Sequence, residues 1–149
     1  MISKILVPTD GSETANQSVE YAAGLAQQLG ATTTLLSVID ISVILAQPIP
    51  AIASPAHLQE SVEDYMRQAA KACIQEATRI CKENGIQPET VSRSGHPVEE
   101  IINEAVKSKV DLIVMGSQGR SALKAAFLGS VTFGVIHKDT KIPVLVVRK

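Results

Sequence analysis

Residues 110–120 have the sequence Val-Asp-Leu-Ile-Val-Met-Gly-Ser-Gln-Gly-Arg, an apolar run that stops at a glycine. Gly119 follows three residues after this first glycine, and Gly129 stands directly before Ser-Val-Thr and a second helical pattern. Glycine lets a backbone approach a ligand and adopt positive φ angles, and a helix N-terminus presents unpaired N–H groups and the positive end of its dipole. A buried strand followed by this turn and helix start predicts a phosphate or nucleotide site at the C-terminal edge of a parallel sheet.

The rest of the chain alternates between strand and helix patterns. Short apolar or β-branched runs predict five strands, at Lys4–Pro8, Thr32–Val38, Gln87–Ser94, Asp111–Met115 and Ile142–Val147. Helical spacing of apolar residues predicts four helices, at Thr14–Leu29, His57–Asn84, Val98–Ser108 and Ser130–Lys138. This alternation predicts an α/β fold with parallel strands and right-handed crossovers, and the polar third strand is expected at an edge of the sheet.

Turn residues punctuate this pattern. Ser12 or Thr14 is expected to cap the first helix, and Gly30 to end it. The segment Ile41–Pro55 is apolar, contains three prolines and has no clear period, so an irregular loop is expected there. Such a loop either forms a lid or contact surface, or packs on its own domain.

Length and composition limit the function. The 149 residues fit one domain spanning 1–149, and 45% of them are hydrophobic. The net charge of −1, without a basic run, argues against a general nucleic-acid binder. Residues 1–4 lack the plan of a signal peptide, and no apolar run reaches the roughly 20 residues of a membrane span, so a soluble cytoplasmic protein is expected. Cys73 and Cys81 stand about 12 Å apart along one helix, which predicts buried thiols rather than a disulfide.

Polar residues near the predicted strand ends are candidates for ligand contacts. Asp10 follows the first strand, where a carboxylate can accept hydrogen bonds from ribose hydroxyls or help hold a phosphate-bound Mg²⁺; alternatively it caps the next helix. Hydroxyl groups suited to phosphate oxygens are found on Ser117, Ser130 and Thr132. Positive charge between the glycines comes from Arg120 and Lys124, which are equally interpretable as solvated surface residues. The spacing matches neither the Walker A loop nor the Rossmann glycine fingerprint.

Several motifs together resemble the universal stress protein family in its ATP-binding subgroup. These motifs are Gly116-x2-Gly119-x9-Gly129-Ser130, Lys4-Ile5-Leu6-Val7-Pro8-Thr9-Asp10-Gly11-Ser12, Gly95-His96-Pro97 and Pro143-Val144-Leu145-Val146-Val147. The resemblance covers the whole chain in the right order. It implies a three-layer, Rossmann-like fold, akin to the adenine nucleotide α-hydrolases, with five parallel strands in the order 3-2-1-4-5. It also implies a homodimer that pairs through Pro143–Val147.

The same resemblance implies a binding site for ATP, or for AMP or ADP, with Mg²⁺ reached through the phosphates. It assigns the adenine and ribose end to Pro8, Thr9, Asp10 and Val38. It assigns the ribose and α-phosphate to Met115, Gly116, Gln118 and Gly119, and the outer phosphates to Gly129, Ser130, Val131 and Thr132. The chain departs from the family pattern at Phe133-Gly134, where a glycine early in a helix costs about 1 kcal/mol relative to alanine.

The sequence offers little support for an enzyme. Neither His57 nor His137 is paired by sequence with a nucleophile. His96, in a loop near the predicted strand ends, is the least implausible base, but a lone loop histidine is more often a solvated residue, and no catalytic residue is assigned. A nucleotide-responsive stress or regulatory protein, acting on an unidentified partner, is therefore the favoured interpretation. Two alternatives remain: a slow Mg²⁺-dependent ATP hydrolase that uses Asp10, and a nucleotide-free dimeric interaction module that docks through the proline-rich loop.

Overall fold

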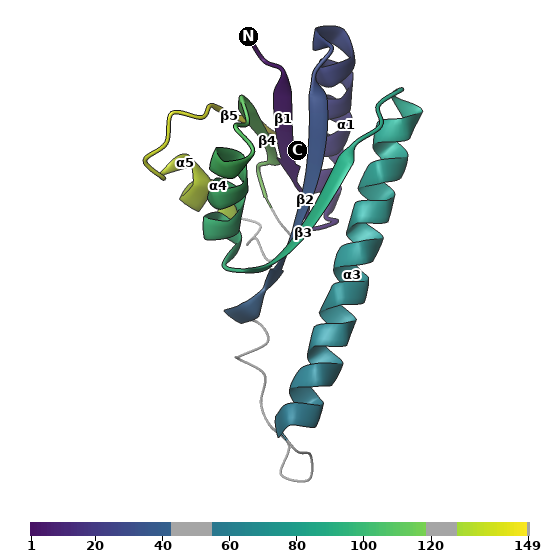
Figure 1. Cartoon of the computed structure of the whole chain (residues 1–149), viewed down its shortest axis with the longest axis vertical. Helices are drawn as coiled ribbons and strands as arrows, with labels where there is room; N and C mark the ends of the chain where they lie inside the picture. Colours follow the sequence, from purple (N-terminus) through teal and green to yellow (C-terminus); the bar gives the residue numbers. More distant parts are fainter. Residues whose placement is uncertain (43–54, 119–127, 149) are drawn as a thin grey trace.

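A computed structural model gives the fold and describes residues 1–42, 55–118 and 128–148, with residues 55–61 described by backbone alone (Figure 1). Its elements are β1 (Lys4–Pro8), α1 (Glu13–Leu29), β2 (Thr32–Asp40), α3 (Pro55–Glu83), β3 (Glu89–Gly95), α4 (Pro97–Lys107), β4 (Leu112–Gly116), α5 (Ser130–Ile136) and β5 (Val144–Val147). The strands form one parallel sheet in the order β3-β2-β1-β4-β5. The predicted α/β class, strand order and edge position of the third strand are confirmed.

The sheet separates two hydrophobic layers because successive side chains in a strand point to opposite faces. Ile5 and Val7 of β1 face α1 and α3, whereas Leu6 faces α4 and α5. The first layer is closed mainly by small side chains of the helices, including Ala22, Ala23, Ala26, Ala77 and Cys81. The second is closed by larger ones, including Ile101 and Val135. Figure 1 shows α1 and α3 on one side of the sheet and α4 and α5 on the other.

The ends of the helices follow local chemistry. The Ser12 side chain accepts a hydrogen bond from the Ala15 N–H at 3.2 Å, so Ser12 rather than Thr14 caps α1. Gly30 ends the helix with φ +65°, as predicted. Pro97 occupies the first turn of α4, where its missing N–H is not needed.

Other element boundaries differ slightly from the predicted ones. The β2 strand continues two residues past Val38 to Asp40, because β3 pairs with it over that length. The α5 helix begins at Ser130 as predicted but ends at Ile136 rather than Lys138. Most of the predicted Ile41–Pro55 loop lies outside the described residues, so its interpretation stays a prediction.

Gly134 has a packing role in α5. A Cβ atom at this position would lie 2.6 Å from Cγ2 of Val98, which belongs to α4. The glycine therefore lets the two helices approach closely. This contact offsets the loss of helix stability that a glycine causes in a helix interior. Among the described residues, no helix combines the length and apolar character needed to cross a membrane.

Candidate functional site

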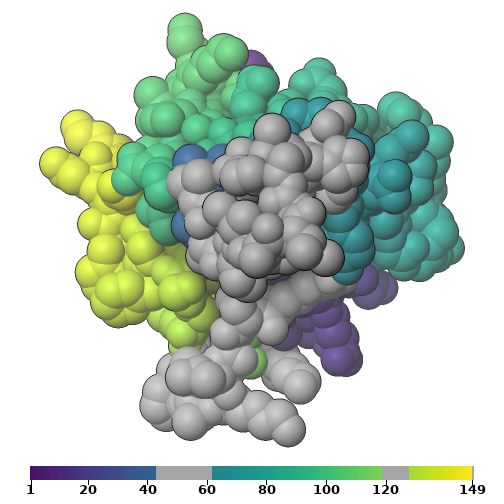
Figure 2. Space-filling view, turned by 90° about the horizontal axis from the view of Figure 1, so that it is seen from below, coloured from purple at the N-terminus to yellow at the C-terminus, as the bar shows by residue number. Residues whose placement is uncertain are grey.

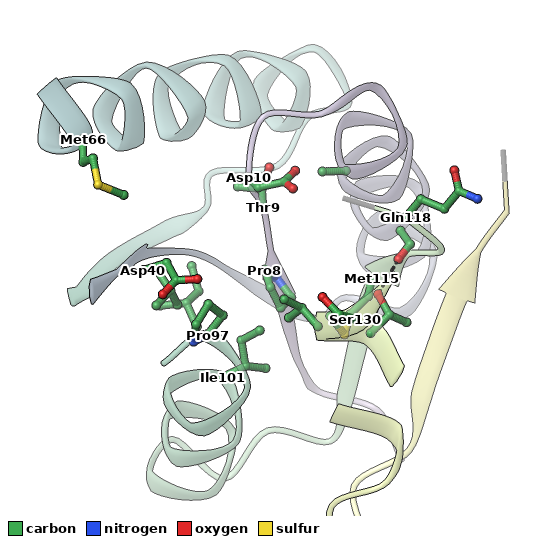
Figure 3. Close-up of a pocket in the computed structure, with 16 residues that line it drawn as sticks. Pro8, Thr9, Asp10, Asp40, Met66, Pro97, Ile101, Met115, Gln118 and Ser130 are labelled. Carbon is green, nitrogen blue, oxygen red and sulfur yellow. Dashed lines mark hydrogen bonds between the residues drawn. The ribbon is translucent and has the colours of Figure 1, made fainter. Parts of the chain in front are cut away.

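A cavity of about 350 Å³ opens at the carboxyl ends of β1, β2 and β4 (Figure 3). Its walls come from these strand ends, from the start of α4, from the start of α5 and from α3. Figure 2 views the molecule from this end, with α3 in teal on one side and α5 and β5 in yellow on the other. Ligands of doubly wound sheets bind beyond the carboxyl ends of the strands, where the strand order reverses. The cavity occupies that place beside β1 and β4.

The structure brings ten of the thirteen predicted site residues to this cavity. They are Pro8, Thr9, Asp10, Val38, Met115, Gly116, Gln118, Ser130, Val131 and Thr132. Two others, Ser117 and Gly129, do not line it, and Gly119 lies outside the described residues, as do Arg120 and Lys124. Residues from four separate segments of the chain therefore line one cavity, as expected if the ligand binds beyond the carboxyl ends of the strands.

The floor of the cavity is apolar. Leu36, Ile101 and Met115 contribute side chains that are at most 4% exposed, and Pro8 and Val38 add further apolar surface. Such a floor accepts a flat, weakly polar ring by excluding water from both. The polar groups stand around this floor rather than on it.

Asp10 stands at the mouth of the cavity, two residues after the end of β1 (Figure 3). Its side chain is exposed, and Oδ1 accepts a hydrogen bond from the Ser12 N–H at 2.9 Å. Gly11 has φ +78° in this turn, and its N–H donates to Oγ1 of Thr9 at 3.2 Å. Asp10 therefore shapes the turn that precedes α1 and does not cap the helix, which corrects that alternative and leaves the carboxylate at the cavity.

The opposite wall is the start of α5. The first bond of this helix runs from the Phe133 N–H to the Gly129 carbonyl oxygen at 2.9 Å, so the N–H groups of Ser130, Val131 and Thr132 precede it. Gly129 occupies the N-cap position, where no side chain caps the helix. An anionic group in the cavity would meet these N–H groups and the positive end of the helix.

Of the predicted hydroxyl donors, Thr132 has a structural role instead. Thr132 donates its hydroxyl hydrogen to the Gly116 carbonyl oxygen at 2.8 Å, which ties α5 to the end of β4. Ser117 is buried; its N–H donates to the Val147 carbonyl oxygen and its own carbonyl oxygen accepts from the Gly129 N–H. The prediction that the Thr132 hydroxyl donates to a phosphate is therefore corrected, because its hydrogen is already donated to Gly116. Ser117 is held by its backbone bonds, and the role given to its hydroxyl stays a prediction. Ser130, which is exposed, keeps its hydroxyl at the cavity.

Six lining residues were not predicted: Ala15, Leu36, Asp40, Met66, Pro97 and Ile101. The signal for Asp40 was its place two residues beyond the predicted strand end at Val38, just as Asp10 lies two residues beyond Pro8. Its Oδ1 accepts hydrogen bonds from the Ser42 N–H at 2.9 Å and the Ser42 hydroxyl at 2.6 Å. The side chain of Met66 reaches the cavity from α3, and the sequence carries no signal for that approach (Figure 3).

Other reactive side chains lie away from the cavity. Cys73 and Cys81 are buried in α3 and are not joined in a disulfide, as predicted. Burial raises the pKa of Cys81 to about 11, so its thiol is protonated at neutral pH and a poor nucleophile. His137 stacks on Phe133 in α5, with ring centroids 4.0 Å apart. Within the described residues, no three His, Cys, Asp or Glu side chains come together as metal ligands.

The chain matches known proteins along its whole length. The model of the universal stress protein family matches residues 1–148. The universal stress protein YxiE of Bacillus subtilis is 34% identical over 149 residues, which cover 99% of this chain and 100% of YxiE. The universal stress protein MJ0531 of Methanocaldococcus jannaschii is 32% identical, over 100% of this chain and 84% of the relative.

Solved structures share the fold. The structure of MJ0577 from Methanocaldococcus jannaschii superposes with a TM-score of 0.86 at 32% identity, covering 100% of this chain and 97% of that one. A universal stress protein in complex with cAMP gives a TM-score of 0.66 at 24% identity, covering 99% and 97%. One from Archaeoglobus fulgidus in complex with dAMP gives 0.68 at 19% identity, covering 98% and 97%. By sequence match and by fold, this chain belongs to the universal stress protein family.

Proposed function

We propose that this chain is a cytoplasmic, nucleotide-responsive stress protein, a single domain over residues 1–149 that binds ATP or another adenine nucleotide in the cavity at the carboxyl ends of β1, β2 and β4. The observation that carries the proposal is the arrangement of this cavity. A buried apolar floor lies between a carboxylate at one side and the first N–H groups of α5 at the other. A nucleotide has the same order of parts: an apolar ring, a ribose with hydroxyl donors, and an anionic tail.

Each part of the nucleotide has a matching group. The adenine ring would lie over Leu36, Val38 and Ile101, where burial removes apolar surface from water. The ribose hydroxyls would donate to Asp10, whose turn is fixed by the Ser12 N–H. The phosphates would accept from the N–H groups at the start of α5. Universal stress proteins of this fold have been solved in complex with cAMP and with dAMP, which supports an adenine nucleotide as the ligand proposed for this chain.

The residues fit a nucleotide-bound Mg²⁺ only indirectly. Asp10 is a carboxylate at the cavity that could contribute an oxygen to a hydrated cation that the phosphates already hold. Mg²⁺ would neutralise phosphate charge there. The residues of this chain would bind the phosphates through the N–H groups at the start of α5 and would exclude water from the adenine ring through the apolar floor.

The protein also dimerises in this proposal, through the segment Pro143–Val147. The β5 strand is at the edge of the sheet, and all four of its residues, Val144 to Val147, are apolar and only half-buried. Leu145 and Val147 pack on one hydrophobic layer and Val144 on the other, so both faces of this edge border the core. An apolar edge strand of this kind favours pairing with a second strand.

Isothermal titration tests nucleotide binding most directly. We expect ATP and AMP to bind the wild-type protein, with Mg²⁺ strengthening ATP more than AMP because ATP carries more phosphate charge. Adenosine should bind more weakly than AMP, since it lacks the group that meets α5. An absence of heat with every adenine nucleotide at saturating concentration would refute the proposal.

A further inference from the structure

The β3 strand ends the sheet on the side opposite β5. It pairs with β2 through seven consecutive partners, from Thr34–Glu89 to Asp40–Gly95, and its other edge has no neighbouring strand among the described residues. Five of its seven residues are exposed, and only the final glycine is buried. A long and regular open edge presents unpaired N–H and C=O groups, which are a template for another strand.

The sequence of this edge is complementary to itself when reversed. Glu89-Thr90-Val91-Ser92-Arg93 is centred on Val91. If two copies pair in antiparallel fashion about a two-fold axis at Val91, each Glu89 stands opposite an Arg93 and each Thr90 opposite a Ser92. Opposite charges and hydroxyl pairs directly across from one another are favourable in antiparallel sheets, and like charges are not.

The register of this pairing is specific. A slip of two residues in one direction places Arg93 opposite Val91, and in the other direction it places Glu89 opposite Val91. Either slip removes both ion pairs. Charges on an edge strand usually discourage association, but here they favour it in a single arrangement.

The folded structure holds these side chains where the pairing needs them. Glu89, Val91 and Arg93 alternate onto one face, and Val91 packs against the hydrophobic layer that contains α4. Arg93 Nη2 lies 3.6 Å from Oε2 of the buried Glu104 on α4, while the Arg93 side chain remains 42% exposed. Because a guanidinium has five donors, Arg93 can hold Glu104 and also donate to a second carboxylate from another molecule.

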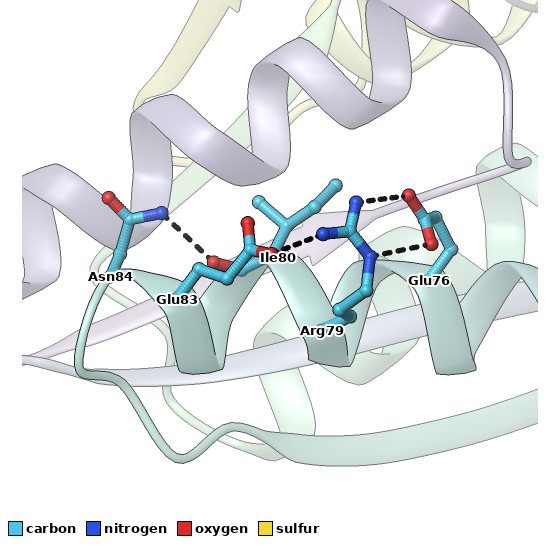
Figure 4. A network of polar contacts seen from close by, with 5 residues as sticks. All are labelled: Glu76, Arg79, Ile80, Glu83 and Asn84. Carbon is cyan, nitrogen blue, oxygen red and sulfur yellow. Dashed lines mark hydrogen bonds and ion pairs between the residues drawn. The ribbon is translucent and has the colours of Figure 1, made fainter.

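The other face of β3 is open. The α3 helix packs on β2, and a groove of about 760 Å³ separates it from the start of β3, where Thr90 forms part of the wall. Arg79 of α3 is bonded to Glu76 and Glu83, so it lies along the helix rather than across the groove (Figure 4). A partner strand can therefore reach the edge without displacing a helix.

We propose that the β3 edge binds a second copy of this chain, as an antiparallel strand pair with its two-fold axis at Val91. A two-fold interface of this type uses the same surface on both copies. It is separate from the β5 edge, so the two interfaces together would produce assemblies larger than a dimer, with a sheet that continues from copy to copy.

Two charge reversals test the pairing by analytical ultracentrifugation. In Glu89→Arg, both cross-strand pairs become Arg–Arg, and in Arg93→Glu both become Glu–Glu. Each variant alone should associate through this edge about tenfold more weakly than the wild type. An equal mixture of the two restores both Glu–Arg pairs, so it should recover wild-type association. A mixture that sediments like its components, or variants that sediment like the wild type, would overturn the proposal.

Folding and the β5 edge are controlled separately. The Arg93→Glu variant places a second carboxylate beside Glu104, and it could unfold for that reason, which circular dichroism would show. In that case the double variant Arg93→Glu/Glu104→Gln, which removes the repulsion, is used in the mixture in place of Arg93→Glu. A second readout uses Val91→Cys, which meets its own copy at the axis and should form an intermolecular disulfide on mild oxidation. Ser94→Cys is the matched control, because two copies of residue 94 lie far apart in this register. Equal cross-linking of both variants would contradict the arrangement, whatever the β5 edge does.

Discussion

The carbonyl oxygen of Thr14 lies 2.8 Å from the position that a Cβ atom on Gly116 would occupy. The carbonyl carbon of Thr14 and the amide nitrogen of Ala15 lie 2.9 and 3.2 Å from the same point. The hydroxyl of Thr14 also donates to the Gln118 carbonyl oxygen. The first turn of α1 is thus packed onto the end of β4, and Gly116 is needed for that packing whether or not a ligand approaches it.

Gly116→Ala should therefore destabilise the protein without any ligand present. The contacts are backbone atoms, which cannot move aside as a flexible side chain can, and overpacking of this kind costs about 1–3 kcal/mol. Urea unfolding followed by circular dichroism measures the change. Gly24→Ala is the control: a Cβ atom there meets nothing within 4 Å, and the substitution should stabilise α1 by up to about 1 kcal/mol. Equal stabilities for the two variants would contradict the close approach.

Gly134→Ala should also destabilise, although alanine is the better helix former. The added Cβ would lie 2.6 and 3.3 Å from the two γ-methyl carbons of Val98. Val98→Ala removes both methyl groups, so the double variant should be more stable than the sum of the single changes predicts. A double-mutant cycle of urea unfolding free energies measures this coupling, which we expect at about 0.5–3 kcal/mol. Strict additivity would show that α4 and α5 do not press on each other here.

Asp111 should make stability depend on acid pH. Its Oδ2 accepts hydrogen bonds from the Ser3 N–H, the Ser3 hydroxyl and the Lys4 N–H, each at 2.9 Å, and these donors lower the pKa of the carboxyl below its usual range. A carboxyl with a lowered folded-state pKa stabilises the fold above its unfolded pKa of about 3.9, and that stabilisation is lost as the pH falls through the folded-state value. Through these bonds the Asp111 side chain holds the start of β1 beside the start of β4.

Thermal unfolding of wild type and Asp111→Asn across pH 2–7 measures this contribution. The wild type should have the higher Tm at neutral pH, and the difference should shrink once the pH passes below about 4. Glu20→Gln on the exposed surface of α1 serves as a control for the general loss of a carboxylate. A difference between wild type and Asp111→Asn that stays constant down to pH 2 would contradict the role given to the three donors.

The sequence predicts the sheet well because the relevant signals are local. Alternation at Ile5, Leu6 and Val7 gives a strand with two buried faces, and Gly30 ends a helix through its own φ angle. Strand order itself came from a family resemblance, since no local pattern specifies which parallel strands become neighbours. The short edge strand β5 was predicted two residues too long, because apolar character continues through Ile142 while pairing with β4 begins at Val144.

The candidate site likewise contains residues that local sequence signals predict and residues whose place depends on the tertiary structure. Residues just beyond a strand end, such as Asp10, could be predicted because parallel strands end at one edge of the sheet. Met66 was not, because its place depends on how α3 crosses the sheet. The hydroxyl of Thr132 was assigned to a ligand, yet it bonds to Gly116, sixteen residues earlier in the chain. A side chain's partner is a tertiary property, and a hydroxyl near a glycine-rich turn does not reveal which partner it takes.

Ser130→Pro tests the proposed phosphate contact at the level of one N–H group. Proline is tolerated at the first position of a helix, where its N–H has no intrahelical partner. It also requires an extended residue before it, and Gly129 has φ −67° and ψ 159°. The substitution should therefore keep α5 and remove one donor from the cavity. Loss of a hydrogen bond to a charged group costs about 1.5–3 kcal/mol, so ATP and AMP should bind roughly 10- to 150-fold more weakly.

Ser130→Ala separates the backbone from the side chain in this experiment, because it removes the hydroxyl and keeps the N–H. Isothermal titration of both variants with AMP and adenosine gives four affinities. If the N–H group meets the phosphate, Ser130→Pro weakens AMP binding and leaves adenosine binding unchanged, while Ser130→Ala weakens AMP binding less than Ser130→Pro and also leaves adenosine binding unchanged. If adenosine weakens as much as AMP, the proline has disturbed the cavity floor, and the orientation that places the phosphates on α5 is wrong.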